Sequence, residues 1–208
     1  MAKLDPRPIL QDARTQLEDT EKIEHMQVIE QSLSNIDIKA VDINNCLFVK
    51  TDCMQTSLRR STIAVCTFDS CDFIASDLSD GGIRATTFNH CRIGGLDVST
   101  SNLQDLKFTD CKIDSLNMRM SKCRSIVFTD CLIQEIDIVS AEVNKISFIN
   151  CTISKLNLMG AKLTKFDISL SQVDQIDGLA GARGLIINQN QLFQLSGDMA
   201  NQLGIIVG

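Results

Sequence analysis

The sequence predicts an all-β solenoid, a right-handed parallel β-helix with about 7.5 coils of 20 residues each and a short C-terminal helical cap. Three observations predict it. An apolar residue occupies every fifth position, two of the five classes of position carry no charge, and the same residue types recur every 20 residues. We consider these periods first, because a repeat protein whose repeat is overlooked is misassigned as a whole.

The five-residue period starts at Ile23 and ends at Val173, and all 31 of its positions hold Ile, Leu, Val, Phe, Met or Cys. Between Ile23 and Asp177 there are 35 charged residues, and none lies on this series or two residues before it. Because an unpaired buried charge is very costly, both charge-free positions are expected to face inward. A helix repeats its apolar face every 3.6 residues and a strand every two, so a five-residue period indicates a chain that turns a corner at each fifth residue.

A longer period groups these quintets in fours. Phenylalanine recurs six times and cysteine five times, each at a spacing of 20 residues. The positions are Phe48, Phe68, Phe88, Phe108, Phe128 and Phe148, and Cys71, Cys91, Cys111, Cys131 and Cys151. Four quintets are therefore expected to form one coil, with equivalent side chains stacked in ladders. At the usual spacing between strands the stack would be roughly 36 Å long.

The two ends of the chain lack the period and divide it into three segments. Residues 1–22 are expected to form a lead-in, either a polar helix starting near Pro8 or an irregular segment. Residues 23–177 form the β-helix, and the glycine-rich stretch after it ends the repeat. Residues 178–208 are expected to form a cap, with a strand at 185–187, a helix over 189–203 and a terminal strand at 205–207.

The cap contains apolar residues that could contact the solenoid or a second copy of the chain. In the expected helix they follow a helical spacing. The candidate contacts are Leu192, Leu195, Met199, Leu203, Ile205 and Val207. A homodimer through this cap is therefore one expectation.

Composition argues against several classes of function. The chain has nine Phe but no Trp and no Tyr, so a stacking platform for single-stranded nucleic acid is not expected. The net charge of −6 does not favour a broad phosphate-binding surface, and we expect no direct nucleic-acid binding. We expect no membrane association, because no apolar run approaches the length of a membrane span. Nine Cys without an evident signal peptide favour the cytoplasm.

Catalytic, metal and cofactor sites are not expected either. The cysteine ladder has no C-x-x-C pair and its successive members are 20 residues apart, so its thiols are interpreted as small core side chains. His25 and His90 lie at outward positions, outside any visible ligand set. A regular solenoid also makes few clefts in which acid-base groups could be perturbed. We therefore predict a protein without enzymatic activity, and an enzyme of unknown class is the alternative.

The repeat resembles that of the pentapeptide-repeat proteins, whose pattern is A(D/N)LXX, over about 155 of 208 residues. Quintets that match it are 76–80 (SDLSD), 101–105 (SNLQD) and 161–165 (AKLTK). The resemblance implies that the central apolar residue and the small residue two places before it both point inward. This chain departs from the pattern where larger residues stand at the second of these positions, as in Leu106, Ile126, Ile146 and Phe166. The coils are therefore expected to be less uniform than the family's usual square.

One outward row is rich in aspartate and is the candidate acidic ladder for partner binding. Its members are Asp37, Asp77, Asp97, Asp137 and Asp177, with Asn117 and Asn157 at intervening positions. Repeated negative charge along a rod could imitate the phosphates of a duplex. Exchange of Asp for Asn favours the simpler interpretation that these side chains bond to nearby backbone groups.

The sequence thus predicts a non-enzymatic interaction or scaffold protein that presents a rigid β-helical surface to a protein partner. The resemblance adds an alternative, because several pentapeptide-repeat proteins bind type II topoisomerases as duplex mimics and protect them from quinolones. A DNA-mimicking binder of DNA gyrase is therefore the second hypothesis. Net acidity and the aspartate row motivate it, and the basic residues that interrupt the surface count against it.

Overall fold

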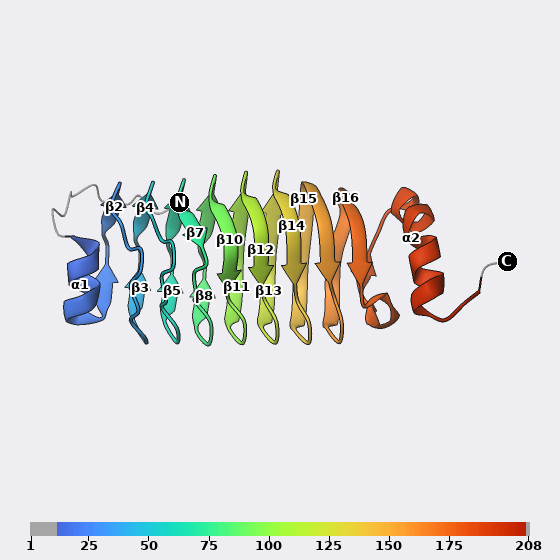
Figure 1. The fold of residues 1–208 in the computed structure, drawn as a ribbon, viewed down its shortest axis with the longest axis horizontal. Coiled ribbons are helices and arrows are strands. Elements are labelled where there is room, and N and C mark those ends of the chain that lie inside the picture. The colour runs from blue at the N-terminus through green and yellow to red at the C-terminus, as the bar shows by residue number, and fades with distance from the viewer. Residues whose placement is uncertain (1–11, 207–208) are drawn as a thin grey trace.

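The computed structural model describes residues 12–206 and contains a parallel β-solenoid of about eight turns with a helix at each end (Figure 1). The first half holds helix α1 and nine short strands. They are α1 (Ala13–Thr20), β1 (Lys22–Glu24), β2 (Gln27–Ile29), β3 (Asp42–Asn44), β4 (Leu47–Val49), β5 (Thr62–Ala64), β6 (Thr67–Asp69), β7 (Asp72–Ile74), β8 (Gly82–Arg84) and β9 (Thr87–Asn89).

The second half holds longer strands and the C-terminal cap. The strands are β10 (Arg92–Asp97), β11 (Asn102–Thr109), β12 (Lys112–Asn117), β13 (Lys122–Thr129), β14 (Leu132–Asp137), β15 (Glu142–Asn157) and β16 (Lys162–Asp177). The cap consists of the 3-10 turn η1 (Leu179–Gly181), β17 (Leu185–Ile186) and helix α2 (Gln189–Gln202). Within the described residues, no helix is both long enough and apolar enough to cross a membrane.

The register of the strands confirms the 20-residue coil. Paired strands are parallel, and partners such as Ile23 and Ile43, or Phe108 and Phe128, differ by 20 in number. The backbone N–H groups of each coil donate to carbonyls of the next or previous coil, as from Lys107 N to Thr86 O at 3.1 Å. Equivalent residues therefore stack along the axis of the rod.

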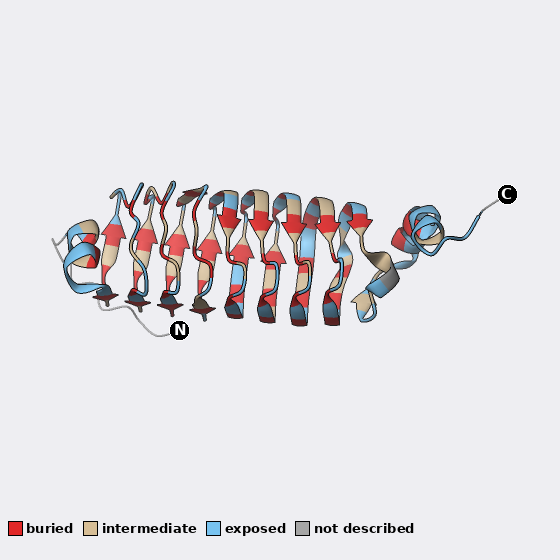
Figure 2. Ribbon diagram, turned by 60° about the horizontal axis from the view of Figure 1, so that its bottom comes forward, coloured by how far each residue is buried: buried red, intermediate tan, exposed pale blue. Residues whose placement is uncertain are grey.

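Both charge-free positions face inward, as predicted, and Figure 2 shows the buried positions recurring coil after coil. The phenylalanine ladder is stacked, with ring centroids of Phe88 and Phe108 4.7 Å apart and those of Phe108 and Phe128 4.6 Å apart. Thiols of the cysteine ladder lie near carbonyls one coil away, for example Cys111 Sγ at 3.4 Å from Phe88 O. The core is thus one continuous apolar column.

The bend at each fifth residue has a specific backbone form. At 24 positions numbered in multiples of five, a non-glycine residue has the left-handed conformation, with φ of 57° at Val65 and 52° at Ala75. Ser115, Glu135 and Lys155 do not have this conformation, although they occupy the row of Ala75. The corner therefore changes form along the rod, in agreement with the expected non-uniform coils.

Helix α1 covers the first coil. Its buried residues Ala13 and Leu17 join the core, and the backbone N–H of Ala13 donates to Gln31 Oε1 at 2.9 Å. Asp12 caps the helix by accepting a hydrogen bond from Arg14 N at 3.3 Å. The lead-in is thus helical over most of the described part of residues 1–22.

At the other end, β17 adds to the edge of the last coil through the pairing of Leu185 with Phe166. Gly184 precedes it with φ of 96°, and a Cβ there would lie 2.3 Å from Leu163 O, so a glycine is required. Helix α2 follows, close to the predicted bounds. Ile205 and Ile206 belong to no strand, and Val207 lies outside the described residues. Segment 205–206 lacks strand pairing because it follows α2 away from the last coil (Figure 1).

Candidate interaction surfaces

The predicted aspartate row exists as one continuous ladder. Bridges and paired strands join Asp37 to Ser57, Ser57 to Asp77 and so on through each coil to Asp177. The parallel 20-residue register brings these side chains to the same side of the rod, although they are spread over 140 residues. The structure therefore brings all five predicted residues together.

The carboxylates of this row have a local role in the turns. The backbone N–H of Ser79 donates to Asp77 Oδ1 at 2.9 Å, and that of Ser99 donates to Asp97 Oδ1 at 2.8 Å. Asn117 Oδ1 accepts the same bond from Arg119 N at 3.1 Å. Asp and Asn are interchangeable as acceptors here, which explains their exchange along the row.

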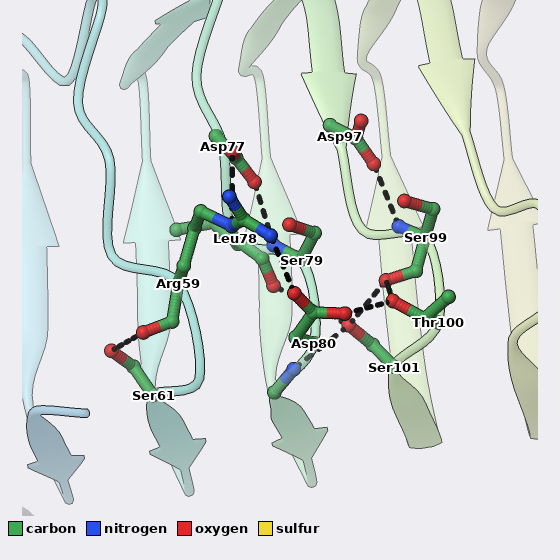
Figure 3. A network of polar contacts seen from close by, with 11 residues as sticks. Arg59, Ser61, Asp77, Leu78, Ser79, Asp80, Asp97, Ser99, Thr100 and Ser101 are labelled. Atoms are coloured by element: carbon green, nitrogen blue, oxygen red, sulfur yellow. Dashed lines mark hydrogen bonds and ion pairs between the residues drawn. The ribbon is translucent and has the colours of Figure 1, made fainter. Parts of the chain in front are cut away.

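Cations also lie beside this row, and Figure 3 shows one of them, Arg59, next to Asp77 and Asp80. Arg59 contacts Asp80 at 2.7 Å through Nη2 and Asp77 at 3.6 Å through Nε. Farther along the row, Arg119 Nη1 lies 3.3 Å from Asp137 Oδ2, and Lys155 Nζ lies 3.4 Å from Asp177 Oδ2. Three of the five ladder carboxylates therefore have a cation within 4 Å, so the row is a surface of mixed charge.

The contacts of Asp80 show how strongly this network favours the ionised carboxylate. Hydrogen bonds from the Thr100 hydroxyl and from Arg59 lower the pKa of the Asp80 carboxyl. The bond to Asp80 in turn raises the pKa of the Arg59 guanidinium. Both groups are solvent-exposed, so the pair adds little to stability. Its main effect is to hold the two side chains in one arrangement across neighbouring coils.

The predicted cap residues divide into two groups. Leu195 is buried and Met199 packs against the core, so both attach α2 to the solenoid. Leu192, Leu203 and Ile205 are exposed, and Val207 lies outside the described residues.

Sequence reasoning missed two exposed residues of the cap, Phe193 and Ile206. Phe193 does not share the helical spacing of Leu192, Leu195 and Met199, so that pattern passed over it. It is the one phenylalanine of the nine that is exposed, at 69%. Its position could have been noticed in the sequence, because it is a phenylalanine that lies beyond the last repeat and does not belong to the apolar face of the helix.

Helix α2 is attached to the last coil by a glutamine whose side chain is buried. The Gln191 side chain is buried, and its Nε2 donates to Ile168 O and to Ser171 O, both at 2.8 Å. Gln191 also completes a capping box with Asn188 at the start of the helix. Carbonyls at the open edge of the last coil are satisfied in this way, and the helix is fixed in place.

The cysteines and histidines do not come together as a site. All nine cysteines are free and buried, and burial raises the pKa of the Cys123 thiol to about 12. His25 Nδ1 lies 2.6 Å from Asn45 Nδ2, and His90 Nδ1 lies 3.4 Å from Asp69 Oδ1, both on the surface. No group of three or more His, Cys, Asp or Glu in residues 12–206 could hold a metal ion.

Comparison with known proteins gives matches to structures and to a family. A trypsin-treated variant of QnrB1, a plasmid-mediated fluoroquinolone resistance protein, is 16% identical over 90% of this chain and 99% of its own, with a TM-score of 0.40. HetL, a pentapeptide repeat protein involved in heterocyst differentiation regulation from the cyanobacterium Nostoc sp. strain PCC 7120, is 10% identical over 81% of this chain and 90% of its own, with a TM-score of 0.32.

No curated protein matches this sequence significantly. The family model described as a pentapeptide repeat region matches residues 61–138 and 85–158. These residues form the central coils, where the ladders of Phe and Cys are uninterrupted.

Proposed function

We propose that this chain, which belongs to the pentapeptide-repeat proteins, is a non-enzymatic interaction protein that presents a rigid surface and forms a homodimer through its C-terminal cap. The observation that carries the proposal is a division of the molecule into polar coils and an apolar end. Of the 13 exposed large hydrophobic residues, six lie within residues 186–206 and seven are scattered over residues 12–185. Exposed apolar surface concentrated in this way is typical of a protein-protein interface.

The exposed members of the cap can supply the centre of such an interface. Leu192, Phe193, Leu203 and Ile205 are exposed by 47%, 69%, 59% and 54%. Large apolar side chains favour association when they are buried from water in the core of an interface. A second copy offers the same apolar surface, so the cap can pair with itself around a two-fold axis.

The dimer is tested by measuring molar mass in solution with light scattering. The double variant Leu192→Ser and Phe193→Ser is expected to be monomeric at concentrations where the wild-type chain is dimeric. The matched control, Met120→Ser and Leu132→Ser, removes two exposed apolar side chains from the coils and should remain dimeric. A wild-type chain that stays monomeric up to high concentration would refute the dimer.

A second candidate function is a duplex-mimicking binder of DNA gyrase, which the continuous aspartate ladder favours. Inhibition of gyrase supercoiling by the purified chain tests it. The variant Asp77→Asn, Asp97→Asn and Asp137→Asn keeps the acceptors for the turns and removes three charges, so it should inhibit less. Absence of inhibition by the wild-type chain would dismiss this candidate.

A further inference from the structure

The C-terminal coils carry most of their cations on one face and most of their carboxylates on the others. The cationic face is here called the basic face and is defined by residues 121–125, 141–145 and 161–165. Between residues 121 and 177 the chain has six cations and seven carboxylates. Five of the cations and one of the carboxylates lie on the basic face: Lys122, Arg124, Lys145, Lys162, Lys165 and Glu142. The other three faces of these coils carry six carboxylates and only Lys155. The charge of the basic face is thus opposite in sign to the net charge of the protein.

The cations of the basic face are exposed, and most of them are unpaired. Lys162 Nζ lies 3.3 Å from Glu142 Oε1. None of the other four cations has a carboxylate within 4.0 Å in residues 12–206. Like charges held near one another on neighbouring coils repel, and an anionic partner removes that repulsion. The basic face is therefore suited to a negatively charged ligand.

A groove runs along this face parallel to the axis of the rod. It has a volume of about 520 Å³, and its floor is formed at Cys123 and Val143, whose side chains point into the core. One wall is the row of Lys122, Glu142 and Lys162, which are successive partners in β13, β15 and β16. The opposite wall is the row that contains Gln104, Arg124 and Asn144. Charged and amide side chains thus converge on one channel.

The dimensions and chemistry of the groove favour a peptide. Its lining spans the three coil steps from Asn102 to Lys162, which at the spacing between strands is about 14 Å, or roughly four residues of extended chain. The amides of Gln104 and Asn144 can both donate to and accept from a peptide backbone. No aromatic side chain lines the groove, so bases of a nucleic acid would find nothing to stack on.

We propose that this groove binds an extended acidic segment, rich in Asp and Glu, of a partner protein. Carboxylates of the segment pair with Lys122 and Arg124, and Glu142 limits the affinity because it is the one carboxylate in the groove. The site is separate from the C-terminal cap and from the aspartate row, so its test does not depend on the dimer or on gyrase.

Binding of a fluorescein-labelled oligoglutamate, followed by fluorescence anisotropy at low salt, tests the proposal. The double variant Lys122→Gln and Arg124→Gln should bind about tenfold more weakly, because it loses two surface ion pairs with the peptide. The variant Glu142→Gln should bind more tightly than the wild-type chain. The matched control, Lys107→Gln and Lys112→Gln, changes the net charge equally on other faces and should bind like the wild type.

Three results would overturn the proposal. The first is no binding of oligoglutamate to the wild-type chain at low salt. The second is an equal loss of affinity in the control variant, which would make net charge rather than the groove responsible. The third is tighter binding of an oligothymidylate than of the peptide, which would assign the groove to single-stranded nucleic acid. All substituted side chains are at least partly exposed, so circular dichroism should show an unchanged fold.

Discussion

The coils before and after residue 90 share one register but fill their corners differently. In the N-terminal coils, small polar residues occupy inward corners, and their hydroxyls bond to backbone carbonyls. Thr56 Oγ1 donates to Leu33 O at 2.7 Å, and Ser76 Oγ donates to Cys53 O at 2.6 Å. In the C-terminal coils large aliphatic residues take these places in two of the four corner rows, as Leu116 does in the row of Ser76 and Ile126 in the row of Thr86.

Strand length changes where the corner residues change. The strands of the N-terminal coils have three residues each. The first strand with six residues is β10, which contains Leu96. Strands β15 and β16 have 16 residues each. A large side chain buried at a corner supports a broader, flatter turn, whereas a small one allows a sharp bend. In these two rows, stability of the N-terminal corners therefore depends on hydrogen bonds, and that of the C-terminal corners depends on apolar burial.

Truncation of corner residues within one row should separate the two halves most clearly. Ile126→Ala removes a fully buried side chain and should lower the free energy of unfolding by about 3 kcal/mol. Thr86→Ala, two coils earlier, removes the hydroxyl that donates to Arg84 O at 2.9 Å and should cost about 1 kcal/mol. Urea denaturation followed by circular dichroism measures both. Equal losses would show that the corners are stabilised in the same way.

A smaller loss of stability is expected when the hydroxyl of an N-terminal corner residue is removed. Ser76→Ala leaves Cys53 O without its buried donor and should cost about 1 kcal/mol, although the new side chain is smaller and apolar. Ala141→Ser is the converse in the C-terminal half, because it buries a hydroxyl in a row that already holds Ser101 and Ser121, and it should be nearly neutral. A stabilising Ser76→Ala, measured by the same denaturation, would contradict this account of the corner.

The smallest effect concerns the backbone of the row that contains Ala75 and Ser115. Ala75 has φ of 52°, so Ala75→Gly relieves a left-handed conformation and should leave stability unchanged or raise it by about 0.5 kcal/mol. Ser115 is not left-handed, so Ser115→Gly should lower stability by about 0.5–1 kcal/mol. Opposite signs in thermal melting would confirm two forms of corner. The same sign at both positions would argue for one form.

The fold was predictable because its signal is repeated about thirty times, and one inconsistent residue could not hide it. The form of the corners was less accessible. Val65 and Thr100 are left-handed although their β-branched side chains disfavour it, since the stacked coils on either side determine their backbone. The terminal strand expected at 205–207 required a partner edge, and sequence alone does not say whether an edge is within reach.

The candidate surfaces also have features that the sequence predicts and features that it does not. The aspartate row followed directly from the 20-residue period. Its partial neutralisation did not, because Arg59 reaches Asp77 in the next coil through the length of its side chain. The basic face is visible in the sequence when charges are counted by quintet face, whereas a count along single rows separates Lys122 from Arg124 and Lys145.

The basic groove and the cap are built on the half of the rod in which two corner rows bury large aliphatic residues, and we claim that this half is the more stable one. Native-state hydrogen exchange measures the opening free energy of each half directly. We predict slower exchange for the amides of β11, β13 and β15 than for those of β2, β4 and β6. Uniform exchange along the rod, or faster exchange in the C-terminal coils, would contradict the claim.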